Sequence, residues 1–139
     1  MSEPLRGIVV AHGDLAASFV ATVDRITGRG DVLLAVSNDG LGADQLRDHV
    51  AEACDPGPAI VFVDLAGGSC AMAGLCLRRT RADVGVLTGL NLPMLLDFVF
   101  HRDMPVDELI GRLEEMARAG IGGHLCGCAE SDAEPSKGS

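Results

Sequence analysis

The sequence of 139 residues contains no tryptophan and no tyrosine, and aromatic residues make up only 3% of it. Basic residues are also scarce, because 11 lysines and arginines stand against 20 aspartates and glutamates, for a formal net charge of -9. Proteins that bind nucleic acids usually present a basic surface, and many stack bases on aromatic side chains. The sequence therefore argues against a nucleic-acid-binding function.

Long apolar runs are missing as well. Hydrophobic residues make up 47% of the chain, but no segment reaches the roughly 18 consecutive apolar residues of a membrane span. The start, Met1 to Pro4, lacks the basic region and the apolar stretch of a signal peptide. The five cysteines are odd in number and irregularly spaced, which is typical of free thiols in a reducing compartment. We therefore expect a cytoplasmic protein with no direct membrane insertion.

Segments with strand and helix patterns alternate along the chain. Short apolar stretches predict four strands, over residues 5–11, 32–36, 59–63 and 84–87. Apolar residues at helical spacing predict helices around residues 15–26, 46–53, 69–80, 93–100 and 105–117. Strands joined by helices indicate an α/β fold, a doubly wound and mostly parallel four-stranded sheet with helices on both faces.

The C-terminal part departs from this alternation. We expect residues 121–125 to form a short edge strand, which either joins the sheet antiparallel or pairs with a second subunit. The residues that follow are polar and short of apolar side chains. The sequence thus predicts one domain over residues 1–125 and a disordered tail over residues 126–139.

Polar residues follow three of the predicted strands. His12 ends the first strand, Asp64 ends the third, and Asn91 comes shortly after the fourth. Because the carboxyl ends of parallel strands share one edge of the sheet, we expect these residues to converge. A carboxylate that accepts a hydrogen bond from Nδ1 of His12 would leave Nε2 free to attack an electrophile. His12 and Asp64 are therefore the candidate catalytic pair, with Asn91 at the rim.

A glycine-rich turn follows the third strand. Gly67, Gly68 and Ser69 open a helix, so their backbone N–H groups and the Ser69 hydroxyl could bind an anion. Gly13 precedes another helix and could add a further N–H donor. A nucleophilic imidazole beside an anion site is typical of phosphoryl transfer. Each of these residues could also be purely structural, and it is their expected convergence that favours a function.

Cysteine offers two further candidate groups. Cys70, in the expected first turn of a helix, is interpreted as a packing residue. His124, Cys126 and Cys128 form a His-x-Cys-x-Cys segment, whose spacing is not that of a standard zinc site. We therefore expect no metal ion and no cofactor.

Three segments carry a family resemblance. They are Ile-Val-Val-Ala-His-Gly (residues 8–13), Val-Asp-Leu-Ala-Gly-Gly-Ser (63–69) and Gly-Leu-Asn-Leu-Pro-Met (89–94). In this order and at this spacing they resemble the enzyme IIA component of the mannose family of the bacterial sugar phosphotransferase system. The resemblance covers about residues 5–125.

The resemblance implies a phosphoryl carrier. Members of the family accept a phosphoryl group from the histidine-containing phosphocarrier protein, on the histidine that His12 matches, and pass it to an enzyme IIB component. The aspartate that Asp64 matches orients this histidine, and the Gly-Gly-Ser turn lies by the phosphoryl group. Members are commonly homodimers that exchange a C-terminal edge strand, which would suit residues 121–125.

Two departures from the family pattern lie at the rim where partners dock. Ser69-Cys70 stands where the family usually has Pro or Thr-Pro, and Ala66 stands where a bulky residue is common. Some stand-alone members look regulatory. Phosphorylation of His12 could therefore instead switch the binding of a regulatory protein, without sugar transport. A dinucleotide-dependent oxidoreductase would also suit an α/β pattern, but the first strand does not lead into G-x-G-x-x-G.

Overall fold

The computed structural model describes residues 4–127, in which strands and helices alternate. The strands are β1 (Arg6–Ala11), β2 (Leu33–Ser37), β3 (Ala59–Val63) and β4 (Val84–Thr88). The α-helices are α1 (Leu15–Thr27), α2 (Ala43–Cys54), α3 (Ser69–Arg78), α4 (Leu92–Val99) and α5 (Val106–Ala119), and a 3-10 turn, η1 (Gly30–Val32), leads into β2. Among these residues, no helix is both long and apolar enough to cross a lipid bilayer.

The four strands form one parallel sheet in the order β2-β1-β3-β4. The chain moves from β1 outward to β2 and then crosses back to β3, on the other side of β1. The direction of winding therefore reverses between β1 and β3. In open α/β sheets, ligands bind beside the carboxyl ends of the two strands at such a reversal. The predicted doubly wound fold is confirmed.

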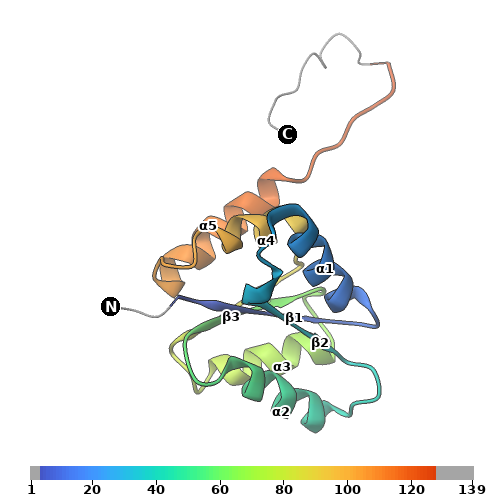
Figure 1. The fold of residues 1–139 in the computed structure, drawn as a ribbon. Helices are drawn as coiled ribbons and strands as arrows, with labels where there is room; N and C mark the ends of the chain where they lie inside the picture. The colour runs from blue at the N-terminus through green and yellow to red at the C-terminus, as the bar shows by residue number, and fades with distance from the viewer. Residues whose placement is uncertain (1–3, 128–139) are drawn as a thin grey trace.

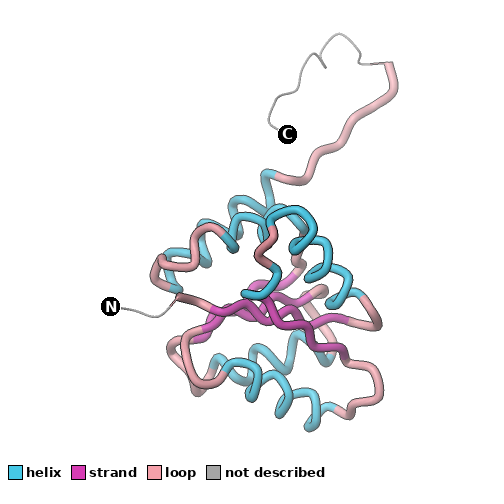
Figure 2. Tube along the Cα trace, in the orientation of Figure 1, coloured by secondary structure: helices cyan, strands magenta, loops and turns pink. Residues whose placement is uncertain are grey.

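Helices cover both faces of the sheet. Helices α1, α4 and α5 lie on one face, and α2 and α3 lie on the other (Figures 1 and 2). Strand β3 is buried along its whole length, as expected for an inner strand between two helical layers. On the α4 side, the rings of Phe62 and Phe98 pack edge to face with centroids 5.2 Å apart. Two apolar layers thus hold the inner strands in place.

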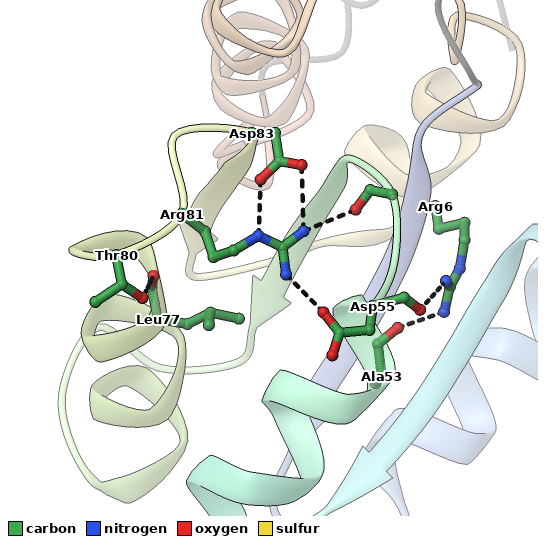
Figure 3. A network of polar contacts seen from close by, with 8 residues as sticks. Arg6, Ala53, Asp55, Leu77, Thr80, Arg81 and Asp83 are labelled. Carbon is green, nitrogen blue, oxygen red and sulfur yellow. Dashed lines mark hydrogen bonds and ion pairs between the residues drawn. The ribbon is translucent and has the colours of Figure 1, made fainter.

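Two arginines join the loops at the amino-terminal end of the strands (Figure 3). Arg6 donates hydrogen bonds to the backbone carbonyls of Ala53 and Asp55, at the end of α2. Arg81 pairs with the carboxylates of Asp55 at 2.9 Å and Asp83 at 2.8 Å, and its hydrogen bonds lower the pKa of Asp83. These contacts serve the structure of this end, whereas His12 and Asp64 lie at the opposite end.

The edge strand predicted over residues 121–125 is not observed. These residues form neither helix nor strand, are exposed, and lead away from the sheet after α5 (Figure 1). An extended segment becomes a strand only by pairing its backbone with a neighbouring strand, and within residues 4–127 this segment has no such neighbour. Most of the tail predicted over residues 126–139 lies outside the described residues.

The close packing of β1 generates a prediction for Gly7. A Cβ atom there would lie 2.6 Å from Cδ2 of Leu33 and 2.8 Å from Cε2 of Phe98. We expect Gly7→Ala to lower the free energy of unfolding by about 1–3 kcal/mol, the usual cost of overpacking a core, as measured by urea denaturation. The control is Gly111→Ala in α5, where an added Cβ would meet open space. It should leave stability unchanged or raise it by up to about 1 kcal/mol. Equal losses in the two variants would contradict the packing described for β1.

Candidate functional site

Strand pairing brings His12 and Asp64 together across 52 residues of sequence. Strands β1 and β3 are parallel neighbours with Val10 opposite Val63, so both leave the sheet at the same edge. One carboxylate oxygen of Asp64, Oδ2, accepts a hydrogen bond from the backbone N–H of His12 at 3.0 Å. The same oxygen lies 2.9 Å from Nδ1 of the imidazole. Asp64 therefore holds both the backbone and the ring of His12.

The two side chains differ in exposure. The side chain of His12 is 43% exposed, whereas that of Asp64 is only 9% exposed. Burial opposes ionisation of Asp64, but the hydrogen bonds from His12 outweigh it and hold the pKa of the carboxyl below its ordinary value. An ionised carboxylate can only accept hydrogen bonds, so Nδ1 of His12 carries the proton in the contact with Oδ2. In the neutral ring, Nε2 then keeps its lone pair.

The second oxygen of this carboxylate is left without a partner. Oδ1 of Asp64 is buried and makes no hydrogen bond with the described residues. Buried polar atoms are rarely unpaired, because such an atom loses its water without gaining a replacement. Both contacts from His12 go to Oδ2, so Oδ1 keeps its capacity to accept a further hydrogen bond or to bind a cation.

A turn at Gly13, directly after β1, orients His12. It depends on Ser37 and Asn38, two residues that the sequence did not single out as site residues. Gly13 has a positive φ of 60°, a conformation that glycine adopts readily. Asn38 accepts a hydrogen bond from the N–H of Gly13 at 3.2 Å through Oδ1, and the hydroxyl of Ser37 donates to the carbonyl of Gly13 at 2.8 Å. Ser37 is the last residue of β2 and Asn38 follows it, so both lie at the same edge of the sheet as His12. This position after a strand is the sequence signal that could have identified them. The N–H of Gly13 is thus occupied, so the expected role of Gly13 in binding the phosphoryl group is not supported.

The glycine-rich turn leads from Asp64 into α3. Gly67, Gly68 and Ser69 are exposed, and Gly68 has a positive φ of 91° as it precedes the helix. No side chain caps the start of α3, so N–H groups of its first turn have no partner within the helix. N–H groups at helix N-termini attract anions in general, and the anion site expected at this turn stays a prediction.

Cys70 is a packing residue that also reaches the site. Cys70 is fully buried, as expected of a packing residue, and its Sγ lies 4.0 Å from Nδ1 of His12. Burial, together with the charge of Asp64, raises the pKa of the Cys70 thiol. The thiol is therefore protonated near neutral pH and is a weak nucleophile.

The side chain of Asn91 makes two structural hydrogen bonds, and its expected place at the rim of the site stays a prediction. Its Oδ1 accepts a hydrogen bond from the N–H of Met94 at 3.2 Å and so caps the start of α4. Its Nδ2 donates to the carbonyl of Ala117 at 2.9 Å and so ties α4 to α5. His124 and Cys126 are exposed, and Cys128 lies outside the described residues.

Comparison with known proteins identifies a family. A family model described as the PTS system fructose IIA component matches residues 7–114, a range that includes both His12 and Asp64. The chain belongs to this family. As an enzyme IIA of the mannose type, the protein has a role in phosphoryl transfer within the sugar phosphotransferase system (PTS), as a transferase component.

Solved structures show the same fold. Phosphotransferase system component EIIA from Streptococcus agalactiae matches with a TM-score of 0.78 and 27% identity, over 86% of this chain and 96% of that one. The mannose/sorbose specific IIA subunit from Enterococcus faecalis matches with a TM-score of 0.76 and 20% identity, over 88% and 96% of the two chains. A putative PTS permease from Klebsiella pneumoniae matches with a TM-score of 0.78 and 20% identity, over 94% and 96%. No curated protein matches this enzyme IIA significantly.

The contact with Asp64 predicts the tautomer of His12 in this enzyme IIA. We expect the neutral ring to carry its proton on Nδ1, and Asp64→Ala to remove this preference because Oδ2 is the acceptor. Ring nitrogen chemical shifts from 15N NMR distinguish the two tautomers. Asp14→Ala is the matched control, since Asp14 is an exposed carboxylate near His12 in sequence, and it should leave the tautomer unchanged. A wild-type ring protonated on Nε2 would contradict the interpretation.

Proposed function

We propose that His12 carries the phosphoryl group in this enzyme IIA. It accepts the group from the histidine-containing phosphocarrier protein and passes it to an enzyme IIB component. The observation that carries the proposal is the pair of contacts from His12 to Oδ2 of Asp64. The ring contact is made by Nδ1, so Nε2 of the exposed imidazole is not engaged by Asp64.

The proposed step is an in-line displacement at phosphorus. The lone pair on Nε2 of His12 attacks the phosphorus atom, and the bond between phosphorus and the donor's imidazole breaks as the new bond forms. The electron pair of the broken bond returns to the donor ring. Nε2 has no proton to lose, so no general base is needed, and the Nδ1 proton stays in its contact with Asp64. The carboxylate stabilises the positive charge that develops on the ring.

Groups at the start of α3 can stabilise the negative charge of the transferred phosphoryl group. The exposed N–H groups and hydroxyl around Gly68 and Ser69 can donate to the phosphoryl oxygens. Phosphoryl transfer depends mainly on such positioning and charge stabilisation. Neither a metal ion nor a nucleotide is required, because the donor is itself a phosphohistidine.

The surroundings of His12 favour a protein as donor and acceptor. Three apolar residues close in sequence to His12, Asp64 and Cys70 are exposed. They are Leu15, which is 43% exposed, Leu65, which is 57% exposed, and Met72, which is 50% exposed. Apolar side chains that are exposed near a functional site are a common feature of protein interaction surfaces. The proposal includes a cytoplasmic location, where such partners act, and a homodimer in which residues 121–125 pair with a second copy.

Reconstitution tests the proposal directly. Incubation with phosphoenolpyruvate, enzyme I and the phosphocarrier protein should add one acid-labile phosphoryl group, detected by intact-protein mass spectrometry. His12→Gln should add none, because Gln has no nucleophilic nitrogen. His49→Gln, which changes an exposed histidine on α2, should be phosphorylated like the wild type. Phosphorylation of the His12→Gln variant would sink the assignment.

The role of Asp64 requires a separate test. Asp64→Ala should slow phosphorylation by at least about tenfold, because the ring loses the carboxylate that fixes its tautomer and stabilises its positive charge, while urea denaturation shows a folded protein. An unchanged rate would show that Asp64 is only structural.

Affinity capture with phosphorylated and unphosphorylated protein then identifies the acceptor. Capture of an enzyme IIB supports the proposal, and capture of a regulatory protein alone contradicts it.

A further inference from the structure

Three side chains of the types that bind metal ions meet at this site. The imidazole of His12, the carboxylate of Asp64 and the thiol of Cys70 each offer one ligand atom, and these atoms all lie within 4.8 Å of one another. They come from three parts of the fold, the ends of β1 and β3 and the first turn of α3. The sequence predicted no metal ion and interpreted Cys70, which is 58 residues from His12, as a packing residue.

The spacing of the ligand atoms suits a tetrahedral ion. Around zinc, with bonds of about 2.0–2.3 Å, neighbouring ligand atoms lie roughly 3.3–3.6 Å apart. Nδ1 of His12 lies 2.9 Å from Oδ2 of Asp64 and 4.0 Å from Sγ of Cys70. The third pair, the carboxylate oxygen of Asp64 and Sγ of Cys70, lies within 4.8 Å, so the three ligand atoms have to move closer together to bind one ion. The side chain of His12 is 43% exposed, so the site is open to solvent on the side of the imidazole.

The unpaired oxygen of Asp64 is an independent sign of a missing ligand. Oδ1 is buried without a partner among the described residues, on a side chain that is 9% exposed. A cation that this carboxylate binds with both oxygens would give Oδ1 a partner, since buried charges are stabilised by pairing or by metal coordination. Neither Asn38 nor Ser69 supplies a hydrogen bond to this oxygen.

The donor set selects the class of ion. Thiolate and imidazole ligands favour zinc and related transition metals, whereas magnesium and calcium prefer sets made of oxygen alone. Three protein ligands leave the fourth position of a tetrahedral ion for water.

We propose that His12, Asp64 and Cys70 bind a zinc ion, and that the bound ion blocks the phosphoryl carrier function. The ion binds the lone pair of Nδ1, so the single proton of the neutral ring moves to Nε2. Nε2 then has no lone pair with which to attack phosphorus. The Cys70 thiol releases its proton to solvent as it becomes a thiolate ligand, so one proton is released for each zinc ion bound. The inhibition rests on the proposed function, whereas the binding of zinc does not.

Binding is tested on the full chain with the metal alone. Competition with a chromophoric chelator should show one zinc ion held by the wild type, and cobalt(II) as a probe should give the near-ultraviolet charge-transfer band of a thiolate ligand. Cys70→Ala should lose the band and bind zinc at least tenfold more weakly. Circular dichroism establishes that this variant is folded.

Two control variants distinguish this site from other thiols. Cys76→Ala changes a half-buried cysteine on α3, and the double variant Cys126→Ala/Cys128→Ala removes the thiols of the His-x-Cys-x-Cys segment. Both should bind zinc like the wild type. Unchanged binding in Cys70→Ala, or loss of binding only in the double variant, would overturn the proposal.

A measurement on the wild type covers the case in which Cys70→Ala does not fold. Zinc should shift the proton of the His12 ring from Nδ1 to Nε2 in 15N NMR spectra. Spectra that leave the His12 ring unchanged at saturating zinc would contradict the site.

The inhibitory effect has its own assay. Zinc at one equivalent should slow phosphorylation of the wild type at least tenfold. Under the same conditions Cys70→Ala should be phosphorylated as fast as the same variant without zinc. This result would also show that zinc has not inhibited enzyme I or the phosphocarrier protein. Equal inhibition of both proteins would contradict the proposal. Absence of phosphorylation without zinc would instead refute the proposed function, and the binding measurements would still stand.

Discussion

The site depends on the parallel pairing of β1 with β3. These strands are distant in sequence, yet their register places Val10 opposite Val63, so that His12 and Asp64 emerge side by side. The two helical layers hold this register, because both strands are buried between them. A shift of one residue would turn every apolar side chain of the strand toward the wrong layer. The geometry of the imidazole and the carboxylate therefore follows from the packing of the sheet.

The carboxylate of Asp64 uses its two oxygens differently, and this asymmetry links the two proposals. Oδ2 holds the backbone and the ring of His12, which selects the tautomer suited to nucleophilic attack. Oδ1 is buried and unpaired, next to a ring and a thiol that can both bind a metal ion. The same group can thus favour a reactive ring in one state and an inactive ring in another. Only the ligand of Nδ1, a proton or a metal ion, differs between them.

Local sequence signals predicted most of the fold. The apolar run over residues 59–63 corresponds to β3, because a fully buried strand needs apolar residues on both faces. Helix α1 ends where Gly28 adopts a positive φ of 72°, as the glycine indicates. The bounds of β2 and β4 differ from the predicted ones by a residue, since the last backbone pairings depend on neighbouring strands. The expected strand over residues 121–125 had no such neighbour within the described chain.

By itself the sequence determined the order of strands and helices, the placing of His12 and Asp64 at strand ends, and the family resemblance. These features rest on short segments, in which hydrophobic periodicity and turn residues act locally. Tertiary structure alone decided which oxygen of Asp64 meets the ring, that Asn38 occupies the N–H of Gly13, and that Asn91 joins two helices. It also brought Cys70 to the imidazole. Each of these contacts joins residues at least 25 positions apart, so it exists only once the sheet and its helices have packed.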